Sequence, residues 1–225
     1  ARTSANAMAE FIEGQQGDLI HDSLKMPLLK LLELETEMQT LILRQWLRRH
    51  EVPMLPEARL HEFLSQLSDV NVNNQAEVCW QGWMIKRYRH NLWLHPQRTF
   101  QPCPTLSWER GMSVQLGADH GQMILDGPEV TVPSAWKIRA RQAGDRIRPL
   151  LQGPSRKIKQ FFQTASIPPW LRSGIPVLEW DQEPVALGDW VISHQLKVWL
   201  AENNVELRWR PTDPVFDRLR NDCQP

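Results

Sequence analysis

The side chains of this sequence that could do chemistry are mostly basic, and they are concentrated in one segment. Between Trp136 and Arg172 there are nine basic residues and one acidic residue, Asp145. The rest of the chain has 17 basic and 25 acidic residues, so the zero net charge hides a strong local excess of positive charge. Arginine and lysine attract phosphates and release counterions on binding, and arginine can donate two parallel hydrogen bonds. The residues predicted to contact nucleic-acid phosphates are Arg139, Arg141, Arg146, Arg148, Arg156, Lys157, Lys159 and Arg172.

Two other interpretations of the basic segment stay open at this level. It could be a solvated face without a ligand, or a surface that docks an acidic domain of the same protein. Nucleic acid is favoured because the basic residues are expected on a strand, a turn and a helix start that can converge, and a helix N-terminus offers free backbone N–H groups to a phosphate. Asp145 follows Gly144 and is interpreted as a residue that caps its own turn, not as a catalytic acid.

The elements that must position these residues can be predicted from the pattern around them. Alternation from Trp136 to Arg141 predicts a strand with one basic face. A turn is expected at Gly144, followed by a short basic helix over residues 155–164. Further strands are predicted at residues 121–125, 129–132, 175–180, 184–187 and 205–210.

The first part of the chain has a different pattern. Apolar residues recur at steps of three and four over residues 28–46 and again over 60–67, which predicts a helical hairpin. Alternation over residues 78–94 predicts a β-hairpin. Three basic residues at the end of the first helix fit RNA contacts and the electrostatics of a helix C-terminus equally well: Arg44, Arg48 and Arg49.

We therefore predict an α+β fold class, with an N-terminal all-helical domain followed by a small mixed α+β C-terminal domain. The expected division is a linker (1–23), a mainly helical central domain with a β-hairpin (24–100), connecting strands and loops (101–133), an α+β C-terminal domain that binds the nucleic acid (134–212) and a frayed tail (213–225).

Several classes of protein are disfavoured by the sequence. The three cysteines form no C-x-x-C pair and no even-numbered framework, so neither a zinc site nor a disulfide scaffold is expected, and the histidines show no metal-ligand spacing. There is no apolar run long enough to span a bilayer and no signal-peptide pattern, which predicts a cytoplasmic protein without a membrane partner. No Gly-rich phosphate loop is present, so we expect no ATP site, no other cofactor and no catalytic residue in this chain.

Four motifs between residues 141 and 178, taken in order, resemble a known family. R-x-x-G-D-R-I-R-P at residues 141–149 is followed by a basic K-I-K segment at 157–159, and then by I-P-P-W-L-R at 167–172 and P-V-L at 176–178. This order is similar to the C-terminal domain of the bacterial tRNA(Ile)-lysidine synthetases. The segments 43–49, 58–64 and 85–94 resemble the central helical domain of that family, and the likeness covers most of residues 30–192.

The resemblance implies a specific activity. These enzymes use ATP, with Mg²⁺, to adenylate C2 of the wobble cytidine of a tRNA(Ile) precursor, and the amino group of free lysine then displaces AMP. The product, lysidine, changes codon reading from AUG to AUA. The family's Ser-Gly-Gly-x-Asp-Ser phosphate loop is missing here, because Ser173 and Gly174 are followed by Ile175.

The chain therefore resembles the substrate-recognition domains that follow the catalytic domain. The resemblance implies that it binds tRNA(Ile), that Arg139, Arg141, Arg146 and Arg148 grip the acceptor end, and that its other partner is its own N-terminal catalytic domain. A dimer is left open. The alternatives are a free-standing RNA-binding module and a module that docks acidic protein, in both cases without a catalytic partner.

Overall fold

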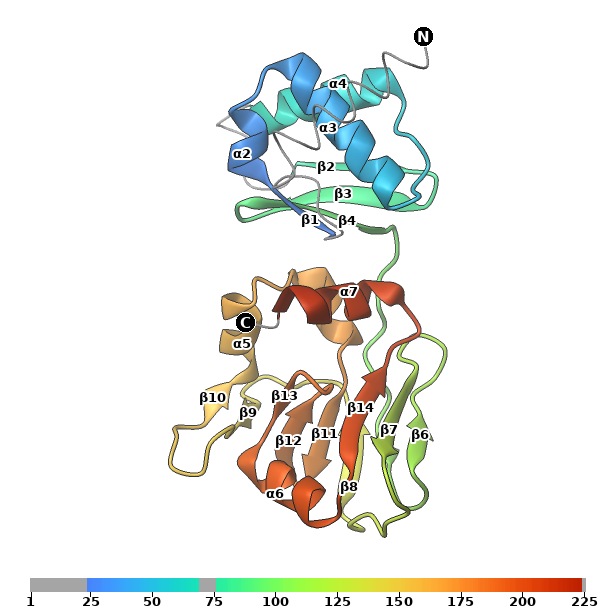
Figure 1. The fold of residues 1–225 in the computed structure, drawn as a ribbon, viewed down its shortest axis with the longest axis vertical. Helices are drawn as coiled ribbons and strands as arrows, with labels where there is room; N and C mark the ends of the chain where they lie inside the picture. The colour runs from blue at the N-terminus through green and yellow to red at the C-terminus, as the bar shows by residue number, and fades with distance from the viewer. Residues whose placement is uncertain (1–23, 69–75, 224–225) are drawn as a thin grey trace. The chain divides into compact units, whose positions relative to one another are not determined.

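The structure is a computed structural model that describes residues 24–68 and 76–223, with side chains up to Arg220 (Figure 1). The predicted linker at residues 1–23 lies outside the described residues. The chain divides into two compact units, one ending at Arg98 and the other beginning at Thr99. Within the described ranges, no helix is long and apolar enough to cross a membrane.

The first unit combines three helices with a four-stranded antiparallel sheet. The helices are α2 (Leu28–Leu32), α3 (Thr36–Arg49) and α4 (Glu57–Ser68). The strands, in sheet order, are β1 (Lys25–Pro27), β4 (Asn91–Pro96), β3 (Trp83–Tyr88) and β2 (Glu77–Trp80). The helices cover one face of this sheet (Figure 1).

The predicted helical hairpin and β-hairpin are confirmed by α3, α4 and the β3–β4 pair. The prediction of an all-helical N-terminal domain is wrong, because β1 and β2 extend that hairpin to four strands. The apolar stripes of the helices supply the core of this unit: Trp46, Leu47, Phe63 and Leu64 are buried. Ile85 and Leu94, paired across β3 and β4, are buried as well.

The second unit is a mixed α+β unit with three sheets. Its strands are β5 (Leu106–Ser107), β6 (Ser113–Gln115), β7 (Gln122–Asp126), β8 (Trp136–Arg139), β9 (Arg146–Ile147), β10 (Arg156–Lys157), β11 (Val177–Trp180), β12 (Glu183–Leu187), β13 (Val191–Ile192) and β14 (Glu206–Arg210). Its helices are α5 (Ile158–Thr164), the 3-10 helix η1 (Pro169–Gly174), α6 (His194–Glu202) and α7 (Pro214–Cys223).

The sheets run in the orders β13-β12-β11-β8-β5, β14-β7-β6 and β10-β9. The loop between β9 and β10 projects away from the five-stranded sheet, and α6 and α7 lie at opposite ends of β14 (Figure 1). Tryptophans form much of the core: Trp136 on β8 makes edge contacts with Trp108, Trp180 and Trp199 at centroid distances of 5.5, 6.0 and 4.8 Å.

Three predictions for this part of the chain are wrong. Residues 101–133 are not a connector, because β5 pairs with β8 and β7 pairs with β14 inside the second unit, and residues 129–132 form no strand. The predicted frayed tail at 213–225 is wrong up to residue 223, since residues 214–223 form α7, and residues 224–225 lie outside the described residues. Phe216 of α7 is buried and packs against Phe100 and Trp209 at centroid distances of 4.8 and 5.1 Å.

Candidate nucleic-acid interface

The two-stranded β9–β10 hairpin carries the densest group of basic side chains. Arg146 lies opposite Lys157 in the antiparallel pair, so both side chains leave the same face of the hairpin. Ile147 occupies the other face and is buried, which fixes the hairpin on the body of the unit. Arg146 is held by its own hairpin, because its Nε donates to the Ser155 hydroxyl oxygen at 2.8 Å and its Nη2 to the Ser155 carbonyl oxygen at 2.6 Å.

Most of the predicted phosphate-binding residues are exposed, and the structure brings several of them together. Four lie on or directly beside the hairpin, Lys159 follows in the first turn of α5, and Arg141 precedes the hairpin by five residues. Within residues 24–68 and 76–223, no ion pair is formed by Arg148, Arg156 or Lys159, so these cations are available to an anion. The exposed set is Arg141, Arg146, Arg148, Arg156, Lys157 and Lys159.

Arg139 does not belong to this surface, and the prediction that it contacts RNA is wrong. Its side chain is 8% exposed and lies between two carboxylates. Nη1 and Nη2 donate to the two oxygens of Asp145 at 2.9 and 3.1 Å, and Nε donates to Glu179 at 2.6 Å. Burial alone would lower the pKa of Arg139, but the hydrogen bonds and charges of both acids outweigh it and raise the pKa above its usual value.

The turn between Gln142 and Asp145 explains why Arg139 is covered. Gly144 has a φ of +93°, which glycine adopts without strain, and this lets the chain reverse immediately after β8. The Asp145 carboxylate then accepts the backbone N–H of Gln142 at 2.6 Å and lies over Arg139. Asp145 therefore caps its own turn, as predicted, and it also fixes the start of β9 through its ion pair.

Arg172 and Arg141 both lie over the ring of Phe162, at 5.4 and 5.8 Å from its centroid. Arg172 is half-buried, and its Nε and Nη2 donate to the Ile167 carbonyl oxygen at 2.9 and 2.7 Å. These contacts hold the segment between α5 and η1 together. A phosphate contact by Arg172 stays a prediction, whereas Arg141 presents its charge on the surface.

Two backbone amides at the N-terminus of α5, where the sequence suggested a phosphate site, are already hydrogen-bonded within the chain. The Ile158 N–H donates to the Asp145 carbonyl oxygen at 3.0 Å, and the Lys157 N–H donates to the Gln160 side-chain oxygen at 3.2 Å. With only seven residues in α5 and these two amides already bonded, an anion contact in this region stays a prediction for its side chains.

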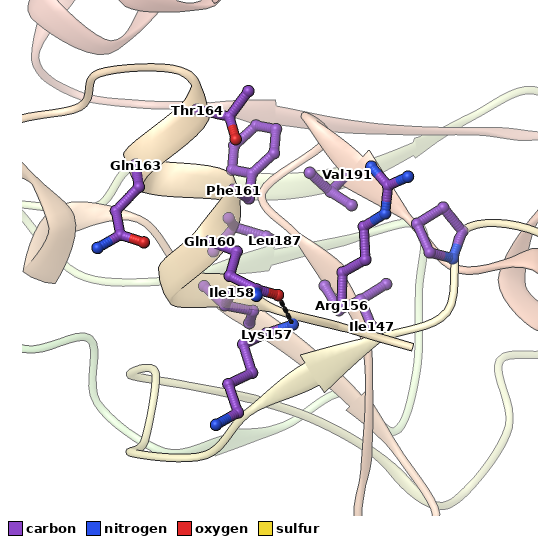
Figure 2. A pocket seen from close by; sticks show the side chains of 11 residues that line it. Ile147, Arg156, Lys157, Ile158, Gln160, Phe161, Gln163, Thr164, Leu187 and Val191 are labelled. Carbon is purple, nitrogen blue, oxygen red and sulfur yellow. Dashed lines mark hydrogen bonds between the residues drawn. The ribbon is translucent and has the colours of Figure 1, made fainter. Parts of the chain in front are cut away.

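Beside the hairpin there is a hollow that the sequence did not reveal. Its volume is about 560 Å³, and side chains of β9, β10, α5, β12 and β13 line it (Figure 2). Two leucines at the tip of the hairpin were also missed: Leu150 and Leu151 are 64% and 66% exposed. An apolar pair between Pro149 and the Gly153–Pro154 turn was the only signal for them in the sequence. Among the described residues, no group of three His, Cys, Asp or Glu side chains is placed to hold a metal ion.

Two family models match the chain, and both come from the same family. Residues 27–93 match the TilS substrate binding domain, and residues 136–209 match the TilS substrate C-terminal domain. Together these two matches cover more than half of the sequence.

Curated relatives carry the name tRNA(Ile)-lysidine synthase. The chain is 30% identical over 175 residues to the protein of Xanthomonas campestris pv. campestris (strain 8004), covering 77% of this chain and 40% of the relative. It is 31% identical over 176 residues to that of Xylella fastidiosa (strain Temecula1), covering 75% and 40%. For Methylococcus capsulatus (strain Bath) the identity is 26% over 195 residues, covering 79% and 42%.

The chain thus spans about two fifths of the length of these relatives. A solved structure described as "Crystal structure of TILS C-terminal domain" aligns with 39% of this chain and 69% of its own at 26% identity, with a TM-score of 0.24, which is too low to bear on the fold. On the two domain matches, the chain belongs to the TilS, or tRNA(Ile)-lysidine synthase, family, of which it carries the substrate-binding domain and the substrate C-terminal domain.

Proposed function

We propose that this chain recognises tRNA(Ile) for a lysidine synthase. The observation that carries the proposal is the exposed basic surface on β9, β10 and the first turn of α5, which lies inside the segment that matches the substrate C-terminal domain. Phosphate contacts of this kind set the position and register of a protein on RNA and carry little sequence information. The chain therefore places the tRNA, and the chemistry takes place elsewhere.

The activity of a full-length member is proposed on the same grounds. Such a protein joins lysine to C2 of the wobble cytidine of tRNA(Ile) at the expense of ATP, with Mg²⁺, in the cytoplasm. Its catalytic domain is proposed as the second partner of this chain. No residue of this chain is assigned to the adenylation or to the attack by lysine, since its sequence contains no Gly-rich phosphate loop.

A salt titration of tRNA binding tests the proposal. With about four to six phosphate contacts, the logarithm of the binding constant should fall with the logarithm of salt concentration with a slope of roughly −3 to −5. The double variant Arg148→Ala, Lys159→Ala should reduce that slope by about one to two units and keep the melting temperature, because both side chains are exposed.

The matched control removes the same charge from other exposed positions of the second unit. Arg110→Ala, Lys197→Ala changes the net charge equally and should leave the slope within error of the wild type. An equal reduction by both double variants would mean that net charge, not this surface, drives binding. An unaltered slope in the first variant would place the tRNA on another surface.

A further inference from the structure

The hollow beside the β9–β10 hairpin has an apolar floor and a basic rim. Ile147 and Leu187 form part of the floor, and both are buried. Phe161 of α5 is half-buried and lines the same hollow, so an aromatic ring is available to a ligand there. The volume of about 560 Å³ lies in the range of sites that enclose most of a small organic group.

The polar groups of the hollow select the charge of its ligand. Arg156 and Lys157 stand at the rim, and none of the eleven lining residues is acidic, which disfavours a cation. Gln160 uses its side-chain oxygen to accept the Lys157 N–H, so its amide nitrogen keeps two donors for a ligand. Figure 2 shows this bond at the edge of the hollow, with the Arg156 guanidinium on the side of Val191. The occupant must therefore combine a flat apolar group, hydrogen-bonding edges and a negative charge.

A nucleotide has these three properties, and the surface around the hollow favours one that belongs to RNA. Arg156 and Lys157 line the hollow and also form strand β10 of the basic hairpin. A nucleic-acid backbone bound to the hairpin would therefore run past the opening of the hollow. A base within a helix has both faces covered by its neighbours, whereas an unpaired base can leave the stack and lie against an aromatic side chain. Stacking of this kind adds to affinity with any base, because every base has a π face.

We propose that the hollow binds one unpaired nucleotide of the RNA that the basic surface holds. The base lies against Phe161 over the apolar floor, Gln160 donates to its edge, and Arg156 binds its phosphate. This proposal rests on the proposed function, since it concerns the same RNA, and it adds to it a preference for RNA in which a duplex adjoins a single-stranded nucleotide.

The test uses three RNA probes and the whole chain. The probes are a blunt-ended RNA duplex of seven base pairs, the same duplex with a four-nucleotide 3′ extension, and the same duplex with a four-nucleotide 5′ extension. Wild type should bind at least one extended duplex about tenfold more tightly than the blunt one, as expected for a single stacked base. All three probes should show a steep salt dependence.

Two variants assign that gain to the hollow. Thr164 lines the hollow from the exposed last turn of α5, and Thr164→Trp should fill it and abolish the gain while leaving binding of the blunt duplex unchanged. Phe161→Leu removes the aromatic face without blocking the hollow and should reduce the gain several-fold. The matched control is Val198→Trp on α6, which adds the same bulk at a half-exposed position outside the hollow and should keep the gain.

The outcomes separate the two proposals. Blunt-duplex binding with a steep salt slope but no gain from either extension overturns the nucleotide site and leaves the proposed function intact. A gain that survives Thr164→Trp also overturns the site. No binding of any probe or of tRNA by a chain that melts cooperatively overturns both.

Discussion

The Arg139 guanidinium makes its ion pairs where solvent has little access. The side chains of Arg139, Asp145 and Glu179 are at most 13% exposed. Removing the arginine would leave two carboxylates buried without a cationic partner. This costs far more free energy of folding than losing an ion pair at the surface.

We therefore expect Arg139→Ala to lower the free energy of unfolding by about 3 to 5 kcal/mol. Chemical denaturation followed by circular dichroism measures this. Lys137→Ala, two residues away on the same strand and exposed, is the control and should change stability by less than about 0.5 kcal/mol. A stable Arg139→Ala protein with weakened tRNA binding would return Arg139 to the binding surface.

Burial also controls the chemistry of Cys103. The side chain is 4% exposed, and burial raises the pKa of its thiol to about 11. Because the folded-state pKa lies above the unfolded one, the thiol stays protonated at neutral pH, and its contribution to stability is lost as the pH rises through about 11.

A variant that keeps only this thiol, Cys79→Ser, Cys223→Ser, should react with a thiol reagent at pH 8 at least about a hundredfold more slowly when folded than when unfolded. Absorbance of the released chromophore gives both rates. Equal rates in the two states would show that the thiol is exposed in solution.

At the scale of elements, the ends of the second unit depend on α7. Phe216 is fully buried, and it joins Phe100 at the start of the unit to Trp209 on β14. Packing of this kind makes the last helix part of the core.

Phe216→Ala should therefore cost about 3 to 5 kcal/mol of stability. Thermal melting or denaturant unfolding measures it. Asp217→Ala, whose side chain is 54% exposed and pairs with Arg220 at the surface, should cost less than about 1 kcal/mol. A loss below 1 kcal/mol in Phe216→Ala would mean that α7 is not docked.

Long elements with a clear period could be predicted, and short or distant ones could not. The repeats behind α3 and α4 extend over several turns, and the alternation behind β3 and β4 continues across a tight turn. β1 has three residues and pairs with a strand more than sixty residues later, so no local pattern marks it. In α7 the apolar residues Val215, Phe216 and Leu219 have helical spacing. The helix was not predicted, because most of the residues around them are polar.

For the candidate site, the type of each residue could be predicted from the sequence, but its environment in the fold could not. Composition alone located the basic segment, because charge is visible in the sequence. Exposure depends on what folds back over a side chain, which is why Arg139 and Arg141, both on the predicted basic face, have different environments. The hollow depends on strands β9, β10, β12 and β13 and on α5 meeting in space, and no spacing along the chain encodes its volume.

At the scale of the molecule, the exposed basic residues predicted to bind phosphates are divided unevenly between the two units. All six exposed residues of the basic surface lie in the second unit, which has its own core of tryptophans. Arg44 in the first unit pairs with Glu57 at 3.4 Å, which reduces what it can offer a phosphate.

Residues 99–225 alone should therefore keep most of the salt dependence of tRNA binding, with a slope within about one unit of that of the whole chain. Parallel titrations of the two proteins give the comparison. A slope reduced by more than half would assign a major share of the phosphate contacts to the first unit, including Arg48 and Arg49.

The ion pairs of Arg139 also restrict the conformational freedom of the basic hairpin. They join the turn before β9 to β11 through contacts within the chain itself. In the proposed function, an arriving RNA would meet cations whose backbone is already in place, so the entropy of ordering that backbone would not be subtracted from the binding free energy. On that proposal, electrostatic steering would govern the encounter, and the lifetime of the complex would distinguish one RNA from another.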